Sequence, residues 1–208
     1  MSVEFQGDLF DLASEASLGR LRGSVQRTVL GDGAWVDVRR SWVRGASDVF
    51  RSLVRDVPWR AEQREMYDRV VDVPRLVHTY AADDRLPHRL LTSARQALTN
   101  HYLPELGEPF ETAGCCYYRD GRDSVAWHGD RIGRGSTEDT MVAILSFGDP
   151  RRLLLRPEAG GASIAFTMGH GDLLVMGGSC QRTWQHAVPK VAASGPRISV
   201  QFRPAGVS

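Results

Sequence analysis

The second half of this chain consists of short runs rich in β-forming residues, and this pattern limits the fold more than any other feature. Gly, Asp or Pro separates the runs, and we expect strands at residues 115–119, 140–147, 152–156, 163–168, 172–176, 183–189 and 197–203. Such short, regularly interrupted strands are typical of a sandwich or jelly roll rather than of a parallel α/β sheet. The pattern predicts a mainly β member of the α+β class, with a sandwich or jelly-roll core over about residues 105–205.

Polar and apolar residues alternate in the last of these runs, with Arg197, Ser199, Gln201 and Arg203 set against Ile198, Val200 and Phe202. The two sets therefore lie on opposite faces of a strand. An exposed strand shows the same pattern. A polar face turned into a jelly roll would instead suit an anionic ligand, because two arginines on one face can reach opposite ends of a dicarboxylate.

Helical periodicity occurs before these strands. Residues 46–54 carry apolar side chains at helical spacing, with Asp48 near the start, where a carboxylate can cap free amides. A longer helix is predicted over residues 87–102, because proline suits its first turn, one apolar stripe runs along it, and Pro104 ends the pattern. These helices should flank the core.

The remaining N-terminal half shows weaker patterns. Residues 59–80 are rich in aromatic and basic side chains and indicate a loop or hairpin that covers the core. Residues 1–30 mix short apolar groups with Gly and Ser, so we expect a loosely attached segment there. A single domain should then occupy residues 31–208, with residues 46–104 outside the jelly roll.

Composition excludes several classes of protein. With 208 residues, 42% hydrophobic and 25% charged, the chain can bury a core and is neither disordered nor fibrous. Its three cysteines form no C-x-x-C pair, which argues against a disulfide framework or structural zinc and favours a reducing cytoplasm. The sequence shows no signal peptide and no run of about 18 apolar residues. We expect a cytoplasmic monomer without a membrane segment.

Two histidines and a carboxylate form a candidate metal site. In His128-Gly129-Asp130 the spacing puts both polar side chains on one face of an extended segment, and His186 follows at a predicted strand position. Two imidazoles and one carboxylate are the ligand set of non-haem Fe(II) oxygenases, which leaves metal positions open for co-substrate and O2. An isolated H-x-D is more often a surface turn, so the distal histidine and the arginines after it carry this prediction.

These residues together resemble the AlkB family of Fe(II)- and 2-oxoglutarate-dependent dioxygenases. The resemblance rests on Tyr118-x-x-Gly121 before the H-x-D, on His186, and on the R-x-x-x-x-x-R from Arg197 to Arg203. It covers about half of the chain. It implies a double-stranded β-helix (jelly roll) core flanked by helices, with a nucleotide-recognition lid among residues 46–104.

The resemblance also implies a role for each motif residue. His128, Asp130 and His186 would ligate Fe(II). Arg197 would pair with the distal carboxylate of 2-oxoglutarate, helped by the Tyr118 hydroxyl, and Arg203 would lie near the carboxylate beside the keto group. The implied reaction is oxidative dealkylation of N-alkylated nucleobases in DNA or RNA. It would couple decarboxylation of 2-oxoglutarate to succinate with release of an aldehyde, as in DNA alkylation repair.

The chain departs from the family pattern at three positions. Cys116 and Ser199 stand where the family often has Asn; serine still donates one hydrogen bond, whereas a thiol is a weak donor. Ile132 stands where well-known members carry an acidic residue that contacts the base. These departures leave open a 2-oxoglutarate-dependent hydroxylase or demethylase of a protein or small molecule. A non-catalytic nucleic-acid-binding module is a further alternative, against which the complete ligand set argues.

An alkylated base must leave its stack to reach the iron, so the resemblance implies a pocket with stacking faces. His128 could supply one face, and we expect Tyr80, from the segment that resembles the lid, to supply the other. Further candidates for contact with the substrate are Trp59, Tyr67, Arg75, Arg131 and Arg134.

The N-terminus contains a second motif. Gln6-Gly7-Asp8-Leu9-Phe10 resembles the Q-x-x-L-F pentapeptide by which bacterial replication and repair proteins dock on the sliding clamp. Leu9 and Phe10 would fill an apolar pocket while Gln6 bonds to its rim. The alternative is that both apolar side chains pack on the domain.

Overall fold

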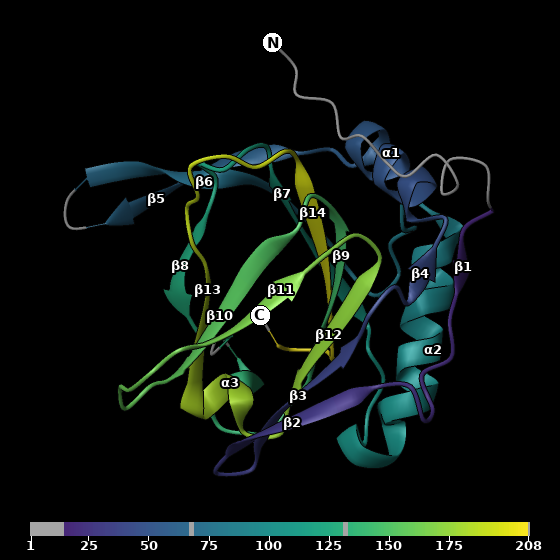
Figure 1. Cartoon of the computed structure of the whole chain (residues 1–208), viewed down its shortest axis with the longest axis vertical. Helices are drawn as coiled ribbons and strands as arrows, with labels where there is room; N and C mark the ends of the chain where they lie inside the picture. Colours follow the sequence, from purple (N-terminus) through teal and green to yellow (C-terminus); the bar gives the residue numbers. More distant parts are fainter. Residues whose placement is uncertain (1–14, 67–68, 131–132, 208) are drawn as a thin grey trace.

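Two antiparallel sheets enclose the interior of the domain. The structure is a computed structural model that describes residues 15–66, 69–130 and 133–207. The large sheet has the spatial order β2 (Gln26–Gly31), β3 (Ala34–Arg39), β12 (Asp172–Gly177), β9 (Val142–Gly148), β14 (Arg197–Arg203), β7 (Thr112–Tyr118), β6 (Arg69–Tyr80) and β5 (Arg60–Met66). The small sheet has the order β11 (Ile164–Met168), β10 (Arg151–Pro157), β13 (Trp184–Val188) and β8 (Val125–His128). Figure 1 shows the two sheets curving around a common interior.

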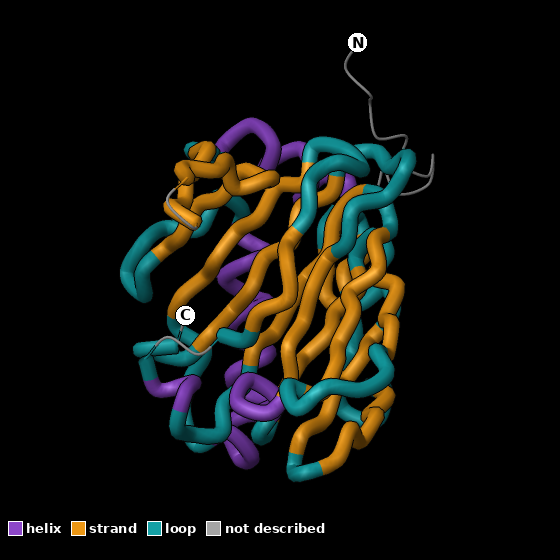
Figure 2. Tube along the Cα trace, turned by 90° about the vertical axis from the view of Figure 1, so that its left-hand side faces the viewer, coloured by secondary structure: helices purple, strands orange, loops and turns teal. Residues whose placement is uncertain are grey.

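The predicted jelly-roll core is confirmed, and each expected strand lies within a few residues of an observed one. The remaining elements are β1 (Ser17–Leu18), which pairs with β4 (Val43–Arg44), the helices α1 (Ala46–Asp56), α2 (Arg89–Leu106) and α3 (Cys180–Thr183), and the 3-10 turn η1 (Arg134–Ser136). The strands run through the body of the molecule in Figure 2, with helical segments behind them and at one end.

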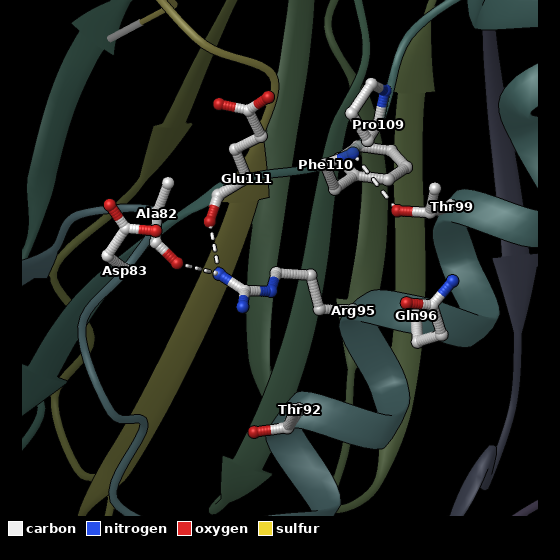
Figure 3. A pocket seen from close by; sticks show the side chains of 9 residues that line it. All are labelled: Ala82, Asp83, Thr92, Arg95, Gln96, Thr99, Pro109, Phe110 and Glu111. Atoms are coloured by element: carbon white, nitrogen blue, oxygen red, sulfur yellow. Dashed lines mark hydrogen bonds between the residues drawn. The ribbon is translucent and has the colours of Figure 1, made fainter.

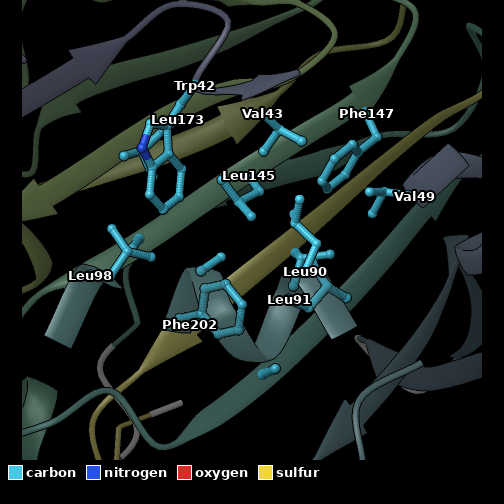
Figure 4. Packing of buried hydrophobic residues seen from close by; sticks show 14 of the residues in the cluster. Trp42, Val43, Val49, Leu90, Leu91, Leu98, Leu145, Phe147, Leu173 and Phe202 are labelled. Atoms are coloured by element: carbon cyan, nitrogen blue, oxygen red, sulfur yellow. The ribbon is translucent and has the colours of Figure 1, made fainter. Parts of the chain in front are cut away.

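Strand β14 separates two buried layers. Its apolar residues Ile198, Val200 and Phe202 are fully buried and pack in the cluster to which α1 and α2 contribute. Figure 4 shows Phe202 and Leu98 among these side chains. Burying each large apolar side chain stabilises the fold by about 1.5–3 kcal/mol. Arg197 and Ser199 on the other face are only 2% and 1% exposed, so the alternative of a solvent-exposed strand is excluded.

Both helices depart from their predicted ends. Helix α2 continues past Pro104 to Leu106, so the prediction that proline ends it is wrong. Pro104 lies in the last turn, where its missing N–H removes a single hydrogen bond, and Gly107 ends the helix with a φ of 81°. Helix α1 begins at Ala46, as predicted, after the left-handed Gly45, which has no side chain for capping, and it continues past Val54 to Asp56. Asp48 lies in its first turn.

Two N-terminal segments belong to the sheets. The stretch expected as a loop or hairpin is a hairpin, because β5 pairs with β6, and it projects from the body of the domain in Figure 1. Strand β2 pairs with β3, so the large sheet begins at Gln26, inside the segment 1–30 for which we expected loose attachment. The clamp-like motif with Gln6, Leu9 and Phe10 lies outside the described residues and stays a prediction.

Across the part of the chain that the structure describes, no helix is long and apolar enough to cross a bilayer.

Gly177 on β12 lies opposite Trp35 on β3. A Cβ added there would lie 2.2 Å from the indole ring of Trp35, a separation that forces the ring or the strand to move. We expect Gly177→Ala to lower the free energy of unfolding by about 1–3 kcal/mol, as overpacking does in other cores. Chemical denaturation would measure this. The control is Gly169→Ala, whose Cβ would meet its nearest atom at 3.5 Å, and an equal loss in both variants would contradict the explanation.

Candidate metal and co-substrate site

The pairing of β8 with β13 brings the two predicted histidine ligands together. His186 lies directly opposite His128, and their ring centroids are 4.1 Å apart. Asp130 follows two residues after His128, and one ligand atom from each of the three residues lies within 4.8 Å of the other two. Asp130 and His186 are buried, whereas the His128 side chain is 41% exposed. The protein therefore encloses two of the three ligands, and the cluster is open to solvent on the His128 side.

Neighbouring groups orient two of the three ligands. Nδ1 of His128 lies 2.8 Å from the carbonyl oxygen of Ala126, to which it donates when protonated, so Nε2 keeps its lone pair for a metal. Nε of Arg203 donates to Oδ2 of Asp130 at 2.8 Å, which leaves Oδ1 without a hydrogen bond from the described residues. The backbone N–H of Asp130 also donates to Oε1 of Gln181 at 3.2 Å. Hydrogen bonds of this kind, which neighbouring groups make to the ligand residues, are typical of a metal centre.

The electrostatics keep the ligands in their metal-binding protonation states. Burial, and then the nearby His128, lower the pKa of His186 to about 3. Burial raises the pKa of Asp130, but the positive charge of Arg203 and the histidines outweigh it and lower the value to about 2. At neutral pH the site therefore offers a neutral imidazole and a carboxylate. This donor set fits Fe(II).

The inner face of β14 continues from the metal cluster to Tyr118. Nε of Arg197 donates to Oγ of Ser146 at 3.0 Å, while its Nη1 has no hydrogen-bond partner among the described residues. A buried donor without a partner costs about 1–3 kcal/mol, and a carboxylate would satisfy it. The guanidinium carbon of Arg197 lies 5.1 Å from the centroid of the Tyr118 ring. The residues predicted for the distal carboxylate of 2-oxoglutarate thus lie together.

Two of the departures from the family pattern face the same interior. Ser199 lies opposite Cys116 in the pairing of β14 with β7. The Ser199 hydroxyl accepts a hydrogen bond from Nε2 of Gln201 at 2.6 Å. Nε of Arg75 donates to Sγ of Cys116 at 3.4 Å. Arg75, which we expected at the substrate, therefore lies beside the co-substrate residues.

Several expected substrate contacts lie elsewhere. Tyr80 is not brought to the metal cluster; it pairs with Ala113 on the helix-facing side of the sheet and is buried in the core. Trp59 packs against Tyr117 with ring centroids 5.3 Å apart. Arg134 forms ion pairs with two glutamates, at 2.6 and 2.9 Å. Tyr67, Arg131 and Ile132 lie outside the described residues.

Sequence patterns did not indicate that Gln181, Ser146 and Arg151 lie at or near this site. The contacts of Gln181 and Ser146 depend on pairings between distant segments, which no local spacing reveals. Arg151 is only 3% exposed, although arginine side chains mostly lie at the surface. Its position as the first residue of β10 was the available signal, because alternation places it on the same face as the buried Leu153 and Leu155.

A separate cavity of about 600 Å³ lies between α2 and the segment before β7. Arg95 crosses it and donates to the carbonyl oxygens of Ala82 and Glu111, as Figure 3 shows. None of its lining residues belongs to the metal cluster or the inner face of β14.

Comparison with known proteins adds three sequence findings. Residues 75–203 match the model of the 2OG-Fe(II) oxygenase superfamily. The alpha-ketoglutarate-dependent dioxygenase alkB homolog 3 of Bos taurus is 33% identical over 181 residues, which cover 77% of this chain and 62% of the relative. The DNA oxidative demethylase ALKBH2 of Arabidopsis thaliana is 35% identical over 112 residues, which cover 41% of this chain and 35% of that protein. The chain thus spans less than two thirds of the length of these curated relatives.

Two solved structures share the fold. The structure of OsALKBH1 superposes with a TM-score of 0.59 at 14% identity, covering 86% of this chain and 100% of that one. A 2OG-Fe(II) oxygenase family oxidoreductase from Burkholderia pseudomallei superposes with a TM-score of 0.52 at 11% identity, covering 76% of each chain. At such low identity the likeness concerns the fold alone.

Proposed function

The chain belongs to the 2OG-Fe(II) oxygenase superfamily, and from this premise we propose that it removes N-linked alkyl groups from nucleobases of DNA by oxidation. The cluster of His128, Asp130 and His186, on the same interior as the unpaired Nη1 of Arg197, carries the oxidative part of the proposal. The name of one relative, a DNA oxidative demethylase, supports methylated DNA as a substrate, and that of another, an alpha-ketoglutarate-dependent dioxygenase, supports the oxidative chemistry. RNA is a second substrate to be tested.

The described residues would bind the metal at one end of the interior and the distal carboxylate of the co-substrate at the other. Nε2 of His128, Oδ1 of Asp130 and His186 would hold Fe(II), and Arg197 would hold the distal carboxylate of 2-oxoglutarate. Iron and 2-oxoglutarate, when bound, supply the oxidising chemistry that consumes O2, yields succinate and releases the alkyl carbon as an aldehyde. Arg203 keeps Asp130 ionised and oriented through the 2.8 Å hydrogen bond.

The open side of the metal cluster is the proposed place for the base. His128 is the one ligand with a substantially exposed side chain, so its imidazole can offer a stacking face to a base that has left its helix. Burial of the other two ligands keeps water from the remaining sides. This arrangement favours a planar substrate that arrives beside His128.

Formaldehyde release tests the proposal. The protein is incubated with Fe(II), 2-oxoglutarate and oligonucleotides that each carry one N-methylated base, as single and double strands of DNA and of RNA. We expect formaldehyde in proportion to succinate with at least one DNA substrate, and a loss of about 10³-fold or more in His186→Ala. Succinate formation without formaldehyde from any oligonucleotide would contradict the proposal and favour a protein or small-molecule substrate. Activity that survives in His186→Ala would remove the metal cluster from the mechanism.

A further inference from the structure

Two arginine side chains approach the ring of Tyr118 from different sheets. Arg197 comes from β14 and has its guanidinium carbon 5.1 Å from the ring centroid, whereas Arg151 comes from β10 and has its own at 5.6 Å. These residues are 2% and 3% exposed. Two positive charges are therefore buried around one aromatic ring.

Backbone carbonyl oxygens, which carry no net charge, accept most of the hydrogen bonds that the Arg151 guanidinium group donates. Its Nη1 donates to the carbonyl oxygen of Asp120 at 3.1 Å, and its Nη2 donates to those of Asp123 and Pro189 at 2.9 and 2.6 Å. These bonds hold the side chain in place. Its Nε has no hydrogen-bond partner within the described residues, and neither has Nη1 of Arg197. Unpaired buried donors on both arginines favour a ligand that supplies acceptors.

The nearby carboxylates do not form ion pairs with these two arginines. Those of Asp120 and Asp123 accept hydrogen bonds from other arginines, at 2.6 and 2.8 Å. Burial lowers the pKa of both Arg151 and Arg197, because a charge is less stable away from water. An anion bound near Tyr118 would offset both buried charges.

We propose that Arg151 is a positioning residue of the co-substrate pocket, where it adds a second buried positive charge to that of Arg197 for the distal carboxylate of 2-oxoglutarate. Attraction between buried charges falls only slowly with distance, so Arg151 contributes even where Arg197 makes the direct hydrogen bonds. The inference rests on the use of 2-oxoglutarate by the superfamily. It does not depend on the nucleic-acid substrate.

Binding of two keto acids tests this role without turnover. 2-Oxoglutarate and 2-oxopentanoate share the keto-acid end, but only the first has a distal carboxylate. Calorimetric titrations with Mn(II) in place of Fe(II) give the affinity of each variant for both. We expect Arg151→Gln to weaken 2-oxoglutarate about tenfold or more and 2-oxopentanoate less than about threefold. Arg151→Lys keeps the charge and should restore most of the ratio between the two affinities.

The matched control is Arg152→Gln, because Arg152 is the exposed neighbour on the opposite face of β10. It should leave both affinities unchanged. Arg151→Met repeats the test if Arg151→Gln does not fold, as judged by thermal unfolding. Equal weakening of both keto acids would reveal a purely structural role and overturn the proposal, as would unchanged affinities. A missing nucleic-acid activity would leave these affinities intact, so the two failures are distinguishable.

Discussion

Replacing Asp130 by Asn is expected to weaken Mn(II) or Fe(II) binding by about 100-fold and to lower turnover by about 10³-fold. The neutral amide cannot balance the charge of a divalent cation. It also leaves Arg203, which now donates to Oδ2 at 2.8 Å, as a partly buried cation without its anionic partner. Equilibrium dialysis of the metal and succinate formation would measure the two effects.

Asp172→Asn is the matched control for this substitution. Asp172 is also a buried carboxylate bonded to an arginine, since Arg40 lies 2.6 Å from its Oδ2, but it lies on β12 outside the metal cluster. We expect Asp172→Asn to lower stability and to leave metal affinity within about threefold of the wild type. If Asp130→Asn retains normal metal affinity, the predicted ligand set is wrong.

The features that the sequence predicted correctly depend on short-range patterns. Alternation along Arg197–Arg203 follows from strand geometry, so the buried polar face was predictable once an interior ligand was inferred. The pair His128 and Asp130 is fixed by a spacing of two. His186 was inferred from its predicted strand position and the arginines that follow it, and the pairing of β13 with β8 brings it opposite His128. The resemblance to the AlkB family is confirmed.

The features that the sequence missed depend on register and on distant contacts. The side of the sheet on which Tyr80 and Arg75 lie is set by the pairing of β6 with β7, and a shift of one residue would exchange the two faces. The burial of Arg151 also depends on contacts with distant segments. Three carbonyl oxygens from two separate loops bond its guanidinium group, so its burial could not be read from its neighbours in the chain. Pro104 shows that a helix breaker is tolerated in a last turn.

The metal-free protein is expected to lose stability as the pH falls from about 6.5 toward 3. His186 resists protonation in the folded state down to a pKa of about 3, whereas in the unfolded chain it takes up a proton near pH 6.5. Between these values the unfolded state binds more protons, so the free energy of unfolding falls by about 1.4 kcal/mol for each pH unit and each such group. Burial also lowers the pKa of His78 and His101, which add to the slope with the same sign.

The window from pH 6.5 to 5 isolates the histidines. Asp130 contributes with the same sign but at lower pH: its folded pKa of about 2 lies below the ordinary 3.8, so its contribution is present above pH 3.8 and is lost only on further acidification. Denaturant unfolding of the metal-free protein at several pH values in this window should show the slope. We expect His186→Gln to reduce it by about one proton, and His101→Gln to reduce it less because His101 is only partly buried. An unchanged slope in His186→Gln would mean that the buried imidazole is not the group that resists protonation, and the open side of the cluster would then have to admit water to it.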